Sequence, residues 1–64
     1  MEYTGSWRAN NGSTYASGYK GRNKKKLAKD MRDMCDGNVF AGNTGHWDVT
    51  DENDNIVLEG VCRN

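Results

Sequence analysis

The stretch NKKKLAKDMRDMCDG, residues 23–37, is the most informative about the fold, because its apolar residues recur with the period of an α-helix. Leu27, Met31 and Met34 stand at i, i+4 and i+7, which brings them onto one face of a helix. Most of the residues between them are charged and fall on the other face. The pattern therefore predicts one amphipathic helix over residues 24–36, with an apolar face that must be buried against another element.

The two ends of this predicted helix have suitable caps but an unusual order of charges. Asn23 is a favourable N-cap, and Gly37 stands where a left-handed C-cap is common. Lys24–Lys26 fill the first turn, where the positive end of the helix dipole disfavours each cation by about 0.3–1 kcal/mol. Three lysines at this end indicate an anion-binding role, neutralisation by the acidic second half of the chain, or a solvated face whose cost the fold tolerates.

The segment before the helix predicts a β-hairpin. Residues 2–9 alternate with the period of two that is typical of a half-buried strand. Asn-Asn-Gly at 10–12 favours a tight turn, and residues 13–21 form the return strand, in which Gly18 and Gly21 indicate a weak point or a bulge. One face of the first strand carries Tyr3, Gly5, Trp7 and Ala9.

The segment after the helix predicts a second hairpin. Apolar residues at 39–40 form the centre of a loop or of one more short strand. A strand begins near residue 46, residues 51–55 form a polar turn, and residues 56–62 form the last strand. By alternation, one face of the last strand carries Ile56, Leu58 and Cys62, and the other carries Val57, Glu59 and Val61.

This element order predicts a small α+β domain. Two hairpins flank one helix in a β-β-α-β-β arrangement, so a mainly antiparallel sheet with the helix packed on one face is the economical solution. We expect one domain over residues 1–64. Only 34% of the residues are hydrophobic, so the core is small and any ligand binds at the surface. The sequence leaves a homodimer open, because a second copy would add core.

The two cysteines, Cys35 and Cys62, are expected to be buried free thiols. A pair does not make a disulfide framework, and the chain has no apolar run of the length that a membrane span requires. From these features we predict a reduced, cytoplasmic protein that has no contact with a membrane.

The charges are divided between the two halves of the chain, although the net charge is zero. Residues 1–34 carry eight basic and three acidic residues, for a net charge of +5. Residues 35–64 carry one basic and six acidic residues, for a net charge of −5. Such asymmetry can mark an interaction surface. An equally good interpretation is that the two halves neutralise each other in the folded protein.

The basic residues predict an anion-binding surface, with nucleic-acid phosphates as the natural ligand. Lys25, Lys29 and Arg32 lie opposite the apolar stripe and form a basic ridge along the helix. Backbone N–H groups at the start of the helix would add to the attraction. The candidate nucleic-acid-binding residues are Arg8, Lys20, Arg22, Lys24, Lys25, Lys26, Lys29 and Arg32.

The aromatic residues of the first hairpin have two interpretations. Tyr3, Trp7, Tyr15 and Tyr19 could stack on the bases of a single strand, as aromatic residues beside cations do. We instead expect them to form the core under the helix, because the chain has few other large apolar residues. The opposite face of this hairpin is small and polar, and could lie in a groove of duplex DNA; it is predicted to carry Thr4, Ser6, Arg8, Thr14 and Ala16.

No motif in the sequence predicts catalysis, a metal or a cofactor. Cys35, His46 and Cys62 lack the paired short spacings of a zinc site and a fourth ligand. Asp51 begins a segment with part of an EF-hand spacing, but the sixth residue of that loop is Ile56, where glycine is required. Residues 41–45 could form a nest of N–H groups for an anion, but a flexible turn is the better interpretation.

Two hypotheses for the function follow, and neither is enzymatic. The first is a nucleic-acid-binding module that uses the basic residues named above. The alternative is a regulator or inhibitor that binds a larger protein through the basic ridge or through an acidic hairpin. That hairpin comprises Asp48, Asp51, Glu52 and Asp54. Which hypothesis is better supported depends on whether the acidic hairpin covers the basic ridge in the folded protein.

Overall fold

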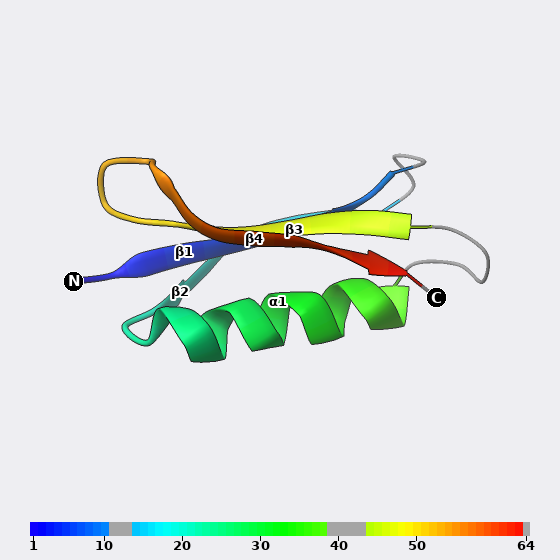
Figure 1. Ribbon diagram of the computed structural model, residues 1–64, viewed down its shortest axis with the longest axis horizontal. Helices are drawn as coiled ribbons and strands as arrows, with labels where there is room; N and C mark the ends of the chain where they lie inside the picture. Colours follow the sequence, from blue (N-terminus) through cyan, green and yellow to red (C-terminus); the bar gives the residue numbers. More distant parts are fainter. Residues whose placement is uncertain (11–13, 39–43, 64) are drawn as a thin grey trace.

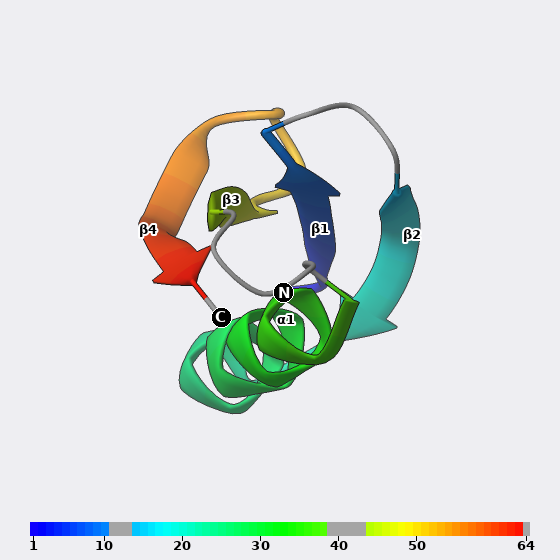
Figure 2. The same ribbon diagram turned by 90° about the vertical axis from the view of Figure 1, so that its right-hand side faces the viewer.

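The computed structural model describes residues 1–10, 14–38 and 44–63. Its elements are β1 (Tyr3–Ala9), β2 (Tyr15–Gly21), α1 (Lys24–Asn38), β3 (Thr44–Thr50) and β4 (Ile56–Arg63). The strands form one antiparallel sheet in the order β2-β1-β3-β4, and α1 packs on one face of it (Figure 1, Figure 2). The predicted α+β class and element order are therefore confirmed. Three predicted features, the glycine of the turn at 10–12, the loop at 39–40 and most of the nest at 41–45, lie outside the described residues.

The strand β1 has the alternation that the sequence predicts. It lies inside the sheet, where it pairs with β2 on one side and β3 on the other. Gly5, Trp7 and Ala9 are buried on the face that α1 covers, and Tyr3 packs against their cluster. Arg8 is exposed on the other face, which we call the open face because α1 does not cover it.

A bulge in β2 separates the two tyrosines that we expected in the core. Ser6 pairs with Ser17 and Gly5 with Tyr19, so Gly18 is an extra residue, and its φ of 87° is one that glycine adopts without steric cost. The bulge reverses the alternation, so that Tyr15 lies on the open face and Tyr19 on the α1 side.

The prediction that Tyr15 and Tyr19 belong to the core is wrong. Their side chains are 75% and 39% exposed, because β2 is an edge strand and α1 packs mainly against the other three strands. The same register corrects the predicted composition of the open face. Ala16 pairs with the buried Trp7, and Tyr15 takes its place beside Arg8.

A second bulge, in β4, explains another wrong prediction. Val49 pairs with Leu58 and Thr50 pairs with Ile56, so Val57 is the extra residue. Leu58 and Cys62 lie on the α1 side as expected, but Ile56 is moved to the open face and is 53% exposed. Val57 packs against the core in its place.

The helix α1 begins as predicted and ends later than predicted. Asn23 is the N-cap, and its Oδ1 accepts hydrogen bonds from two backbone N–H groups of the first turn. Gly37 lies within the helix and has no positive φ, so it is not a left-handed cap. The helix continues to Asn38, whose Nδ2 donates to the carbonyl oxygen of Met34 at 2.7 Å. The buried face carries Leu27, Ala28, Met31 and Cys35.

Glycines on the inner side of the sheet let bulky groups approach the backbone. A Cβ atom on Gly5 would lie 2.6 Å from Sδ of Met31, and a Cβ atom on Gly60 would lie 2.7 Å from Cζ2 of Trp47. Both distances are too short for a real contact. The methionine of α1 and the indole of β3 therefore occupy volume that a side chain at these positions would otherwise fill.

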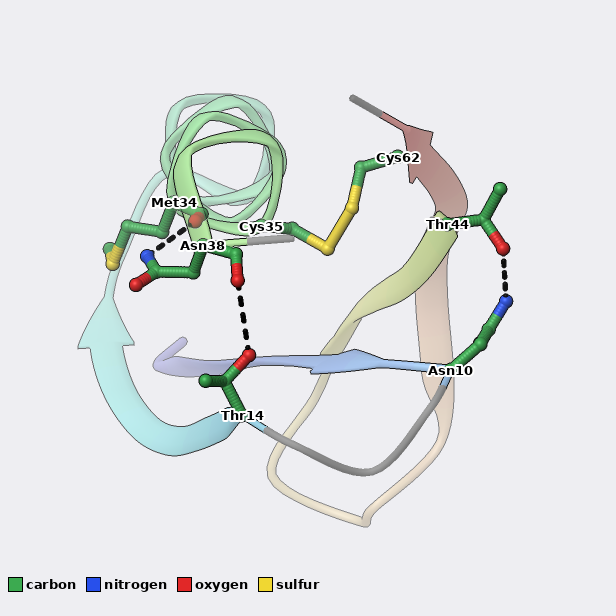
Figure 3. The surroundings of a disulfide bond; sticks show 7 residues. All are labelled: Asn10, Thr14, Met34, Cys35, Asn38, Thr44 and Cys62. Atoms are coloured by element: carbon green, nitrogen blue, oxygen red, sulfur yellow. Dashed lines mark hydrogen bonds between the residues drawn. A yellow bond between two sulfur atoms is a disulfide. The ribbon is translucent and has the colours of Figure 1, made fainter. Parts of the chain in front are cut away.

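The two cysteines form a disulfide bond, which corrects the prediction of free thiols. Cys35 of α1 is bonded to Cys62 of β4, and both side chains are buried (Figure 3). No local pattern indicates this bond, because the cysteines are 27 residues apart and meet only when α1 packs across the sheet. Hydrogen bonds from Asn10 to Thr44 and from Thr14 to Asn38 hold the same end of the molecule together.

Candidate nucleic-acid interface

All eight predicted basic residues are exposed, and they lie on both sides of the sheet, with Lys20, Arg22 and Lys26 around one hollow where β2 leads into α1. Arg8 and Lys20 lie on the open face, where Nζ of Lys20 donates to Oγ1 of Thr4 at 2.9 Å. Arg22 lies in the turn between β2 and α1. The remaining cations belong to α1, on the other side of the sheet: Lys24, Lys25, Lys26, Lys29 and Arg32.

The basic ridge consists of Lys25, Lys29 and Arg32, one helical turn apart. Seven residues of α-helix rise by about 10 Å, so the three cations form a row of this length. All three residues are exposed. The row can therefore contact several successive phosphates of a nucleic-acid strand.

The start of α1 contributes less to anion binding than the sequence suggests. The N–H groups of Lys25 and Lys26 donate to Oδ1 of Asn23 at 3.1 and 3.2 Å, so these two donors are already occupied. Nζ of Lys26 lies 3.3 Å from Asp30. Attraction at this end must therefore come from the lysine side chains and the helix dipole, with little help from the backbone donors.

The acidic hairpin lies away from the basic ridge. Figure 1 shows the β3–β4 connection at the same end of the molecule as the start of α1, but across the sheet from it, and Figure 2 agrees. Within residues 1–10, 14–38 and 44–63, the ion pairs are Lys26–Asp30 and, when the histidine is protonated, His46–Glu59. Neither pair joins the hairpin to the ridge.

Two of the four hairpin carboxylates have structural contacts of their own. Oδ1 of Asp51 accepts hydrogen bonds from the N–H groups of Asn53 and Asn55 at 2.8 and 3.0 Å, which fixes the turn. Oε1 of Glu52 accepts a hydrogen bond from the N–H of Glu2 at 2.9 Å. Asp48 lies apart from the turn, half-buried on the open face.

A hollow beside the ridge contains an aromatic residue that the sequence did not single out. It has a volume of about 290 Å³ and is lined by Ala28, Lys29, Arg32 and Trp47. Trp47 is partly buried, and its Nε1 is a buried donor that has no partner among the described residues. No sequence signal places Trp47 next to the ridge, because that depends on how α1 crosses β3.

A second hollow lies on the open face and has a mixed character. Its volume is about 180 Å³, and its lining includes Arg8, Tyr15, His46 and Asp48. Nε2 of His46 lies 3.1 Å from Glu59 on the neighbouring strand. Arg8 and His46 therefore share this hollow with a carboxylate, whereas the charged residues that line the hollow beside the ridge are both basic.

The described part of the chain contains no group of three or more His, Cys, Asp or Glu residues that could hold a metal ion. Cys35 and Cys62 are bonded to each other and so cannot act as thiolate ligands. No helix among the described residues is both long enough and apolar enough to cross a membrane.

Comparison with known proteins gives no relative: no family model, no curated protein and no solved structure matches this chain.

Proposed function

We propose that the protein is a non-enzymatic module that binds nucleic acid by holding phosphates on the basic ridge and on the lysines at the start of α1. The observation that carries the proposal is that the ridge is exposed and that the acidic hairpin lies across the sheet from it. The helix α1 carries five basic residues and three aspartates, so its own charge is positive although the net charge of the chain is zero. Arg22 and Lys20 extend the basic region around the end of β2 toward Arg8.

The energetic basis of binding would be the release of counterions from the nucleic acid. Three ridge contacts with a single strand predict that log K falls against log salt with a slope of about −2. Further contacts from Lys24 or Arg22 would make this slope steeper.

The experiment measures binding of a fluorescent oligonucleotide by anisotropy at several salt concentrations. The test variant is Lys25→Gln, Lys29→Gln, Arg32→Gln. The control is Arg63→Gln, compared with Lys29→Gln alone, so that each variant of this pair removes one positive charge. We expect the ridge variant to lose most of the affinity and the control to keep most of it. An equal loss in Lys29→Gln and Arg63→Gln, or no binding by the wild-type protein at any salt concentration, would overturn the proposal.

The alternative, a regulator or inhibitor that binds a larger protein, has less support from the acidic hairpin. Asp51 and Glu52 are engaged in hydrogen bonds within the chain, which leaves fewer carboxylate oxygens for a partner. A nuclease-treated pull-down separates the two functions. Recovery of one stoichiometric protein, without nucleic acid, would favour the alternative.

The cytoplasmic location stays a prediction, and one of the two arguments for it no longer holds. It rested partly on reduced thiols, whereas a disulfide is more typical of proteins in oxidising compartments. Fractionation of the source cells, with the thiols trapped by alkylation at lysis, tests both the location and the redox state.

A further inference from the structure

The hollow between Trp47, Lys29 and Arg32 combines three properties that bear on ligand binding. It is an open depression with a volume of about 290 Å³. It has an aromatic wall formed by Trp47. Its charged lining residues are both cations, and both belong to the basic ridge. Trp47 packs against the core and also lines the hollow, so the same residue belongs to both.

The indole of Trp47 is held firmly in place. Trp47 pairs with Trp7 on β1 and with Gly60 on β4, so it lies in the middle of the sheet. The absence of a side chain on Gly60 lets the ring lie against β4, and Nε1 is buried there. Part of the side chain nevertheless lines the hollow, whereas Trp7 is only 7% exposed. A fixed ring needs little ordering when a ligand binds.

We propose that this hollow receives an unpaired base of a single-stranded nucleic acid, which packs against Trp47 while Lys29 and Arg32 contact the flanking phosphates. The inference rests on the proposed function and narrows the ligand from nucleic acid in general to single-stranded nucleic acid. An aromatic ring stacks on any base, but only when that base is not already stacked within a duplex. The protein is therefore expected to prefer single strands over duplexes, with little preference for sequence.

The positive charge of the hollow favours this ligand over an uncharged aromatic molecule. The ring alone would accept any flat apolar group, but two cations at its edge select one that carries anions on both sides. A nucleotide within a strand has this form. If the ammonium of Lys29 or the guanidinium of Arg32 instead lies over the indole in a cation–π contact, the ring is closed to a base and its fluorescence would not respond to one.

The experiment uses tryptophan fluorescence of two matched variants. Trp7→Phe leaves Trp47 as the fluorophore, and Trp47→Phe leaves Trp7. Each variant is titrated with oligo(dT), with an abasic oligonucleotide of the same length and with a duplex, and binding is followed in parallel by anisotropy. We expect oligo(dT) to quench Trp47 and leave Trp7 unchanged. The abasic strand should bind through its phosphates without quenching.

The affinity of a third variant, Trp47→Leu, provides an independent measurement. Loss of stacking is expected to weaken oligo(dT) binding by about 5- to 150-fold and to leave binding of the abasic strand unchanged. If Trp7→Phe or Trp47→Leu does not fold, the wild-type protein and Trp47→Phe are compared instead, because Trp47 is the one residue by which they differ.

The outcomes separate this inference from the function on which it rests. Binding of oligo(dT) without quenching of Trp47, or equal affinity for duplex and single strand, would overturn the stacking site and leave the ridge in place. Failure of every oligonucleotide to bind would overturn both.

Discussion

At the scale of single residues, the close packing of α1 on the sheet depends on glycines, which leave room for neighbouring groups. Gly45 is the most confined of these. A Cβ atom there would lie 2.6 Å from Sγ of Cys35, 2.8 Å from the carbonyl oxygen of Arg8 and 2.9 Å from Sγ of Cys62. A disulfide and a backbone carbonyl cannot move aside as the end of a flexible side chain can. The sheet therefore requires glycine at this position for reasons of space.

We predict that Gly45→Ala lowers the free energy of unfolding by about 1–3 kcal/mol, the usual cost of overpacking. Gly37→Ala is the matched control. Gly37 lies in α1, has no positive φ and has open space where a methyl group would be added, so alanine is expected to raise stability by about 0.5–1 kcal/mol. Urea unfolding of both variants measures the difference. Equal stability of the two would contradict the tight packing around Gly45.

At the scale of elements, α1 combines a favourable cap with unfavourable charges. Asn23 bonds two N–H groups of the first turn, while Lys24–Lys26 oppose the dipole at the same end. The ion pair between Lys26 and Asp30 is exposed and compensates little. A stability cost concentrated at one exposed end is the pattern expected of a binding surface.

We predict that Asn23→Asp changes stability and binding in opposite directions. The carboxylate keeps the cap and complements both the dipole and the lysines, so the free energy of unfolding should rise by about 0.3–1 kcal/mol. The same charge repels phosphates, so affinity for nucleic acid should fall about two- to fivefold.

Asn38→Asp provides the control for this prediction at the other end of the helix. It places the same charge where the dipole disfavours it and removes the donor to Met34, so stability should fall while affinity stays unchanged. Urea unfolding and oligonucleotide anisotropy report the two quantities. An unchanged affinity in Asn23→Asp would argue against phosphate binding at this end.

At the scale of the whole molecule, the disulfide supplies stability that the core cannot. A domain of 64 residues rarely gains more than about 3–5 kcal/mol from its hydrophobic core. The Cys35–Cys62 bond links two residues that are 27 positions apart in the second half of the chain. It thereby joins α1 to the edge strand β4. The strands β2 and β4 are the edges of the sheet, and the homodimer that the sequence leaves open stays a prediction.

We predict that reduction, or the double variant Cys35→Ala, Cys62→Ala, lowers the free energy of unfolding by about 3–4 kcal/mol, the loop-closure value for this separation. Such a loss is comparable to the total stability of the domain. Urea unfolding with and without reductant measures it, and thiol labelling in denaturant counts the free cysteines. Two labelled thiols per chain before reduction would show that the bond is absent.

Local patterns in the sequence were sufficient to predict the helix and the strands. For most of these elements they also predicted which residues share the buried face. The period of 3.6 in residues 23–37 and the period of two in residues 2–9 are local properties, so the helix, β1 and the β-β-α-β-β order could be read directly. The exposure of the basic ridge follows from the same helical period, because its three cations lie outside the stripe of Leu27 and Met31. The position of Lys29 and Arg32 beside Trp47 of the sheet does not follow from this period.

The remaining features depend on contacts between distant segments, and only the folded chain shows them. Two bulges, at Gly18 and Val57, reversed the alternation of β2 and β4, because a single inserted residue changes the face of all that follow. The disulfide and the hollow at Trp47 exist only where α1 crosses the sheet. The separation of the acidic hairpin from the ridge likewise depends on the side of the sheet on which each lies, and no local pattern encodes that choice.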